Sequence, residues 1–194
     1  MAGFWQAITG RTRPKQADLD ALFLVPSAAI TLQTAIGLTP TGTGSVCYRA
    51  ARGAGFADTQ TDVLELIRGA ADAPQVDVSG DEFGFTWLTV HRDPDDMGGL
   101  CTDLHAVNTT LELEGFGPSL LCSTVPFVDS AGRRVALVYL YKQASFYPFA
   151  PGAGGAAKQR DTLLELQVGE TLAAEIPVEK DKARWLALWG APGL

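Results

Sequence analysis

The side chains that could perform chemistry are few, and the most suggestive lie close together in the sequence. Cys101 and His105 are four positions apart, which on a helix puts both on one face and can present two ligands to one metal ion. His91 lies upstream and could approach as a third ligand. Zinc usually needs three or four protein ligands in a recognised spacing. Cys101 also lies on the apolar stripe of its helix, so a buried core thiol is the alternative.

A catalytic thiol is a second form of the same hypothesis. It requires a thiolate stabilised by a nearby base, and Cys122 with either histidine could be arranged in this way. Asp93, Asp95 and Asp96 could hold a hard cation, but acidic residues are also favoured at the positive end of a helix. The glycine-rich stretch 42–44 lacks the lysine and the spacing of a phosphate-binding loop. We therefore expect no cofactor and assign no catalytic residue.

Aromatic residues in the last third of the chain favour a binding function instead. Phe146, Tyr147 and Phe149 occur in a segment that also contains proline and glycine, and Trp185 and Trp189 follow near the C-terminus. Large aromatic side chains dominate the binding energy of many protein interfaces. We expect these five residues to contact a protein partner; the alternative is that they seal the edge of the protein's own core.

The first residues contain a smaller apolar cluster. Phe4, Trp5 and Ile8 share one face of a short predicted helix, and basic residues follow it. Such a helix can lie on a membrane surface, and docking on the body of the protein is the alternative. Because the basic residues come after the apolar ones, the segment does not resemble a signal peptide. We expect a cytoplasmic protein, peripheral at the inner face of the membrane if this helix binds lipid.

Composition favours a single folded domain. The 194 residues are 46% hydrophobic and 19% charged, with a net charge of −7. This charge repels a phosphate backbone and no basic stripe offsets it, so nucleic acid is not expected as a partner. Three cysteines without CxxC spacing are typical of free thiols in a reducing compartment rather than of a disulfide scaffold.

These residues must be positioned by helices and strands that periodicity and turn signals predict. Short helices are expected at 17–24 and 28–36, interrupted at Val25 and Pro26, before a turn-rich connector. The core elements are then expected as strands at 45–50, 76–79 and 83–91, helices at 55–70 and 93–114, and strands at 120–128 and 134–142. The remaining segments are expected as a loop at 143–157, a helix at 162–174 with a strand as competitor, and a short helix after Asp181.

The predicted order gives an α+β fold. Its β-α-β-β-α-β core matches a ferredoxin-like arrangement with an extra antiparallel strand and flanking N- and C-terminal helices. Without the first strand, the order is closer to a secretion-chaperone-like α+β sandwich, and a homodimer is compatible with either. We expect one structural domain, built from an N-terminal helical segment (1–44), an α+β core (45–142) and a C-terminal segment with the aromatic loop (143–194).

Several segments together resemble the PspA-associated PspAB proteins. The similar segments are LDALF (19–23), VPSAA (25–29), GFTW (84–87), TDLHAVN (102–108), LVYLYK (137–142), FYPFAP (146–151) and WGAPGL (189–194). They span essentially the full chain, and their order carries the similarity. The resemblance implies a non-enzymatic accessory or regulatory protein that binds PspA, a coiled-coil protein of the phage-shock envelope-stress response. It implies no catalytic residues; the alternative function is a metal- or thiol-dependent enzyme using Cys101, His105 and His91.

Overall fold

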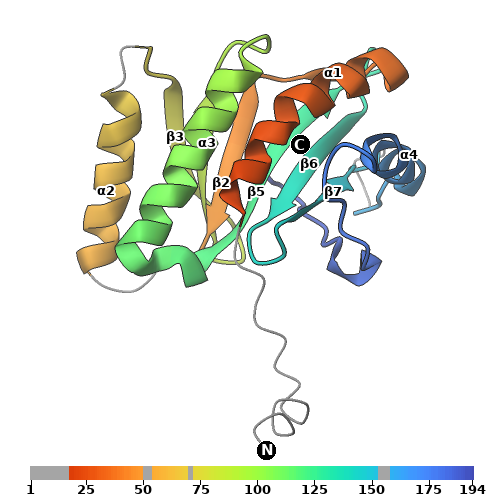
Figure 1. Ribbon diagram of the computed structural model, residues 1–194. Coiled ribbons are helices and arrows are strands. Elements are labelled where there is room, and N and C mark those ends of the chain that lie inside the picture. Colours follow the sequence, from red (N-terminus) through yellow and green to blue (C-terminus); the bar gives the residue numbers. More distant parts are fainter. Residues whose placement is uncertain (1–17, 50–53, 70–71, 153–157) are drawn as a thin grey trace, which may run out of the picture.

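The described residues form a seven-stranded antiparallel sheet with helices along one face (Figure 1). The computed structural model describes residues 18–49, 54–69, 72–152 and 158–194, and only the backbone of 54–57. The α+β class expected from the sequence is confirmed. The predicted N-terminal helix with Phe4, Trp5 and Ile8 lies outside the described residues.

The strand order of the sheet is β3-β4-β2-β5-β6-β7, with β1 pairing beside this path to β5. β4 lies between β2 and β3, and β2 lies between β4 and β5, so the two β-α-β connections interleave. β6 and β7 then extend the sheet beyond this four-stranded unit. The strands are β1 (Thr39–Pro40), β2 (Thr43–Tyr48), β3 (Gln75–Gly80), β4 (Thr86–His91), β5 (Leu120–Val128), β6 (Arg134–Leu140) and β7 (Ser145–Phe149).

The helices of the described chain are mostly those that the sequence predicts. α1, α2 and α3 lie over one face of the sheet and α4 lies beside β7 (Figure 1). The helical elements are η1 (Leu19–Leu24), α1 (Val25–Ile36), α2 (Ala54–Arg68), α3 (Met97–Leu111), η2 (Glu112–Phe116), η3 (Gly117–Ser119), α4 (Thr162–Leu172) and η4 (Lys182–Arg184). Asp161 caps α4 by accepting the amide of Leu164 at 3.0 Å, so this segment is a helix and not the competing strand.

Two helix starts differ from the prediction. Pro26 does not interrupt the first helices, because it lies in the first turn of α1, where a proline removes no helical hydrogen bond. The helix expected from Asp93 begins only at Met97. Asp96 caps it, with its side chain accepting the amide of Gly99 at 2.9 Å, and residues Asp93 to Asp96 form a turn before it.

The segment expected as an aromatic loop was predicted wrongly, because it contains strand β7. This strand pairs with β6 from Ser145 opposite Leu140 to Phe149 opposite Ala136. Proline is usually confined to the edge strands of a sheet, because it cannot donate a hydrogen bond. β7 ends the strand order, so Pro148 is tolerated there. The prolines and glycines that indicated a loop therefore mark an edge strand and the connection after it.

The two faces of the sheet carry separate cores. Side chains alternate along each strand, so Val46 of β2 belongs to the helix-side core and its neighbour Cys47 belongs to the core on the opposite face, the far side. Helices α1, α2, α3 and α4 all contribute buried residues to the helix-side core. The far side is covered by the irregular C-terminal segment 177–194, through Trp185 and Ala191 and the partly buried residues around them.

Candidate functional site

Cys101 lies inside the helix-side core and not in a reactive site. The residue is completely buried on the inner side of α3. Burial raises the pKa of its thiol to about 12, so the thiol is protonated at neutral pH. A protonated, inaccessible thiol is a poor nucleophile and a poor metal ligand. Cys122, the other thiol that sequence reasoning considered, lies in the far-side core.

The two histidines lie at separate places on the surface, each beside its own carboxylate. His105 on α3 is 3.2 Å from the Asp20 carboxylate, and His91 at the end of β4 is 3.0 Å from the Asp77 carboxylate. Cys101, His105 and His91 are therefore not brought together. Across the described part of the chain, no group of three or more His, Cys, Asp or Glu side chains could hold a metal ion.

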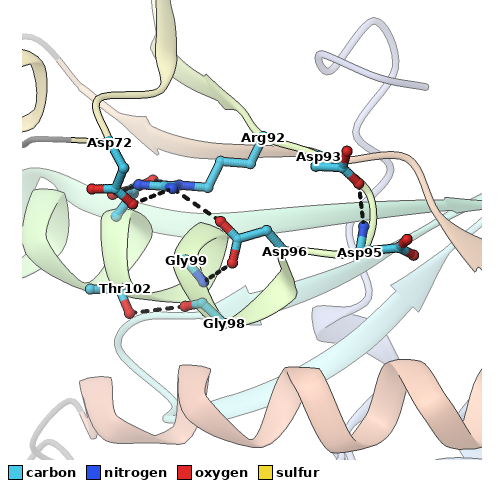
Figure 2. A network of polar contacts seen from close by, with 9 residues as sticks. Asp72, Arg92, Asp93, Asp95, Asp96, Gly98, Gly99 and Thr102 are labelled. Carbon is cyan, nitrogen blue, oxygen red and sulfur yellow. Dashed lines mark hydrogen bonds and ion pairs between the residues drawn. The ribbon is translucent and has the colours of Figure 1, made fainter.

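Arg92, directly after β4, is the centre of a polar network (Figure 2). Its guanidinium donates to both carboxylate oxygens of Asp103, with Nη2 3.2 Å from Oδ1. Nη1 donates to Asp72 and to Asp96, each at 3.0 Å. Through these contacts Arg92 connects three places: the segment before β3, the start of α3 and the inner side of α3. The Arg92 and Asp103 side chains are each only 10% exposed, so this ion pair is largely shielded from water.

The acidic residues around Arg92 accordingly have partners within the protein. Asp96 caps α3, and Asp93 accepts the amide of Asp95 at 2.9 Å in the preceding turn. The hydrogen bond from Arg92 holds the pKa of Asp72 below its usual value. Capping and pairing with arginine account for this cluster, so its geometry supports a structural role.

Most of the aromatic residues expected at an interface are buried. Phe146, Tyr147 and Phe149 are at most 1% exposed and Trp185 is 8% exposed, whereas Trp189 is partly buried. On the far side, Tyr147 stacks on Trp185 with ring centroids 6.1 Å apart, and Phe149 meets Trp189 edge-on at 5.1 Å. These side chains hold β7 against the C-terminal segment. Of these five residues, Trp189 is the most accessible to a partner.

The outer side of the helix layer presents a different surface, which sequence reasoning missed. No Asp, Glu, Lys or Arg occurs between Ala21 and Tyr48, and this charge-free run was the available signal. Within it, η1 and α1 expose Phe23 (46%), Leu24 (39%) and Ile30 (66%) to solvent. Isolated exposed apolar residues are ordinary, but a grouped set marks interaction sites.

Helix α3 lies beside η1 and α1 and continues this surface. His105 contacts the ring of Phe23, with centroids 4.9 Å apart, and the rest of the outer side of α3 carries small uncharged residues. We call the combined surface the uncharged helix face. Its members are Phe23, Leu24, Ser27, Ile30 and Thr34 of η1–α1, and Thr102, His105, Ala106, Thr109 and Thr110 of α3.

The flanking helix α2 shows that this lack of charge is local. In its described part, residues 58–68, the outer side exposes Asp58, Asp62, Glu65 and Arg68, and Leu66 is the one large exposed apolar residue there. Charged residues are therefore exposed on the outer side of α2, whereas the outer sides of α1 and α3 expose none. Interface centres are depleted of charged residues in the same way.

The helical run Leu19–Ile36 is long and apolar enough to cross a membrane by length and composition alone, with a mean hydropathy of 1.5. However, 39% of it is buried in the fold. Its inner residues Val25, Ala28 and Leu32 are fully buried in the helix-side core. Core helices pass the same test, so we assign the inner side of this run to the core and treat its outer side as available for contact.

The chain was compared with family models, curated proteins and solved structures. A family model described as PspAB, PspA associated protein B, matches residues 2–193, nearly the whole chain. No curated protein and no solved structure gives a significant match.

Proposed function

The chain belongs to the PspA associated protein B family, and we propose from this membership that it is a non-enzymatic accessory protein that binds PspA through the uncharged helix face. It acts in the envelope-stress response on the cytoplasmic side of the membrane. The observation that carries the choice of surface is the exposure of Phe23, Leu24 and Ile30 within a run that contains no charged residue.

The support beneath this face suits a binding surface. The inner sides of α1 and α3 are fixed by fully buried residues, among them Val25, Leu32 and Leu104. The outer side chains therefore project from rigid helices, and little conformational freedom is lost from the backbone when a partner binds. Asp20, whose side chain is 85% exposed, lies at the margin and provides a polar rim.

A helical partner matches the shape of this face. Amphipathic helices bind by placing their apolar side on a hydrophobic surface. PspA, as a coiled-coil protein, would offer such a helix to the neighbouring outer sides of α1 and α3. Ile30 and Phe23 are then the anchors, because they expose the largest apolar groups of the face.

The test is co-purification of PspA with the full chain and with two matched variants. Ile30→Asp introduces a charge into the face, whereas Leu66→Asp introduces the same charge on α2 at a similarly exposed position (66% and 56%). We expect Ile30→Asp to weaken binding about tenfold or more, as for an interface anchor, and Leu66→Asp to bind as the wild type does.

Two results would contradict the proposal at different levels. If wild-type protein retains no PspA, the proposed function fails. If PspA binds equally to the wild type, Ile30→Asp and Phe23→Asp, the function stands but the uncharged helix face is not the site. Circular dichroism of each variant establishes that a loss of binding does not come from unfolding.

A further inference from the structure

Two of the three cysteines face each other at the centre of the sheet. Cys47 on β2 and Cys122 on β5 are directly paired in the antiparallel register. Residues paired in this way have Cα atoms roughly 4.5–5.5 Å apart, which lies within the range of about 4.4–6.8 Å that a disulfide requires. Both side chains belong to the far-side core, so they point to the same face of the sheet.

The two thiols also contact each other directly, because the side chains of Cys47 and Cys122 are hydrogen-bonded. The register between β2 and β5 shifts only after this pair, between Cys47 and Tyr48. Cys101, by contrast, lies in the helix-side core, on the other side of the sheet from both.

We propose that Cys47 and Cys122 form an oxidative modification site, which closes to a cross-strand disulfide when the protein reacts with peroxide. Both thiols are free in the structure. The reaction needs no group beyond these two side chains and hydrogen peroxide as the oxidant. It is independent of the proposed function, because the pair lies on the opposite side of the sheet from the uncharged helix face.

The chemistry proceeds in two steps. One thiolate attacks a peroxide oxygen, which cleaves the O–O bond, releases hydroxide and leaves a sulfenic acid. The second thiol then attacks the sulfenic sulfur, the S–S bond forms, and the hydroxyl leaves as water. In total, two thiols and one hydrogen peroxide give one disulfide and two waters.

Access to the pair is controlled by the C-terminal segment 177–194. Cys47 is 3% exposed and Cys122 is 6% exposed, and Trp185 and Trp189 of this segment belong to the same cluster. The hydrogen bond to Cys122 and burial raise the pKa of Cys47. The thiolate therefore forms only when the segment moves aside, and the rate of oxidation follows the opening of the far side.

The position of the bridge gives it a structural consequence. In the strand order, β2 is the last strand of the β3-β4-β2 half of the sheet and β5 is the first strand of the β5-β6-β7 half. A disulfide would join these halves covalently and restrict the unfolded chain between them. The oxidised protein should therefore melt at a higher temperature than the reduced protein.

The experiment is peroxide treatment of the purified full chain, followed by denaturation, alkylation and mass spectrometry. We expect a monomer that has lost the mass of two hydrogen atoms and carries one alkylated cysteine, Cys101. Peptide mapping should link the peptide of Cys47 to that of Cys122. This result requires no variant, so it does not depend on whether a cysteine substitution folds.

A Trp189→Ala variant tests the control of access. This change loosens the C-terminal segment without touching either thiol, and we expect it to form the same bridge several-fold faster. Equal rates in the two proteins would overturn the control by the segment. Three alkylated cysteines after prolonged exposure, a bridge that contains Cys101, or disulfide-linked dimers alone would each overturn the proposed site.

Discussion

The two faces of the sheet are covered by different means. On the helix side, aliphatic residues and several aromatic ones, among them Tyr48, Phe127 and Phe146, pack beneath regular helices, whose backbone groups satisfy one another within each helix. On the far side, aromatic residues such as Trp87, Tyr147 and Phe149 pack beneath an irregular C-terminal segment. An irregular segment has no internal ladder of hydrogen bonds, so its buried backbone groups need other partners.

Side chains supply those partners on the far side. Tyr147 donates to the carbonyl of Leu186 at 3.0 Å, and Arg134 donates to that of Gly193 at 2.7 Å. Arg160 donates to the carbonyl of Trp185. The cover of the far side therefore depends on hydrogen bonds from individual side chains, whereas the helices satisfy their own backbone groups. Loss of one such side chain should loosen the far-side cover.

The largest expected effect is that of Phe149→Ala. Phe149 is fully buried against Trp189 and the Arg160 guanidinium, and its truncation should reduce the free energy of unfolding by about 3–5 kcal/mol. Ile30→Ala, on the exposed side of α1, should change it by less than about 0.5 kcal/mol. Urea unfolding measures both. A stable Phe149→Ala variant that no longer binds PspA would instead make β7 part of the interface.

A smaller loss is expected for Arg160→Met. Arg160 Nε lies 2.8 and 3.1 Å from the two carboxylate oxygens of Glu165, whose side chain is only 3% exposed. Removing the arginine leaves a buried carboxylate unpaired, which should cost about 2–4 kcal/mol. Urea unfolding should show partial recovery in Arg160→Met/Glu165→Gln, because the amide is neutral and its oxygen can still accept the amide of Ala150.

An exposed ion pair provides the control for this substitution. Lys158 contacts Glu82 at 3.3 Å, and the two side chains are 62% and 68% exposed. Lys158→Met should cost less than about 1 kcal/mol. Equal losses in Lys158→Met and Arg160→Met would contradict the dependence of the far side on buried partners.

The smallest of the losses expected on the far side concerns Glu179, which accepts from the Ser145 hydroxyl and the amide of Asp181. Burial disfavours its charge, but these hydrogen bonds and Arg184 prevail and hold the pKa of Glu179 below its usual value. Its contribution to stability is therefore present above the unfolded pKa, about 4.3, and is lost as pH falls through the lower folded pKa.

Glu179→Gln should consequently destabilise the protein by about 1–2 kcal/mol at neutral pH. The difference from the wild type should shrink as pH falls below the unfolded pKa of about 4.3 and through the lower folded pKa. Urea midpoints measured across this range test the prediction. A difference that stays constant with pH would show that the charge of Glu179 does not stabilise the cover.

Local signals in the sequence predicted many elements of the fold. The alternating strands Leu120–Val128 and Arg134–Leu140 and the cap at Asp161 are found where they were expected, because each depends on residues within a few positions. β7 was missed because it forms a strand by hydrogen-bonding to β6. The composition of residues 145–149 alone does not reveal this pairing. The start of α3 was misplaced because Asp93 and Asp96 are both acceptable caps by type.

The candidate site shows the same division. The apolar stripe of α3 indicated correctly that Cys101 could be a core thiol. The charge-free run beginning at Ala21 was visible in the sequence, but which of its apolar residues remain outside the core depends on how α1 packs on the sheet. From the sequence, the C-terminal aromatic residues could either contact a partner or seal the protein's own core. Phe146 and Phe149 are at most 1% exposed, so these two residues lie in the core.

Composition and periodicity by themselves determined the α+β class and most helices and strands. The order of short sequence motifs along the chain indicated the family. Tertiary structure alone decided that Cys47 meets Cys122, that Arg92 joins three carboxylates, and that Ile30 rather than Phe149 faces solvent. The physical reason is that periodicity and capping act within one element, whereas strand register and the choice of covering segment are set by contacts between residues distant in the chain.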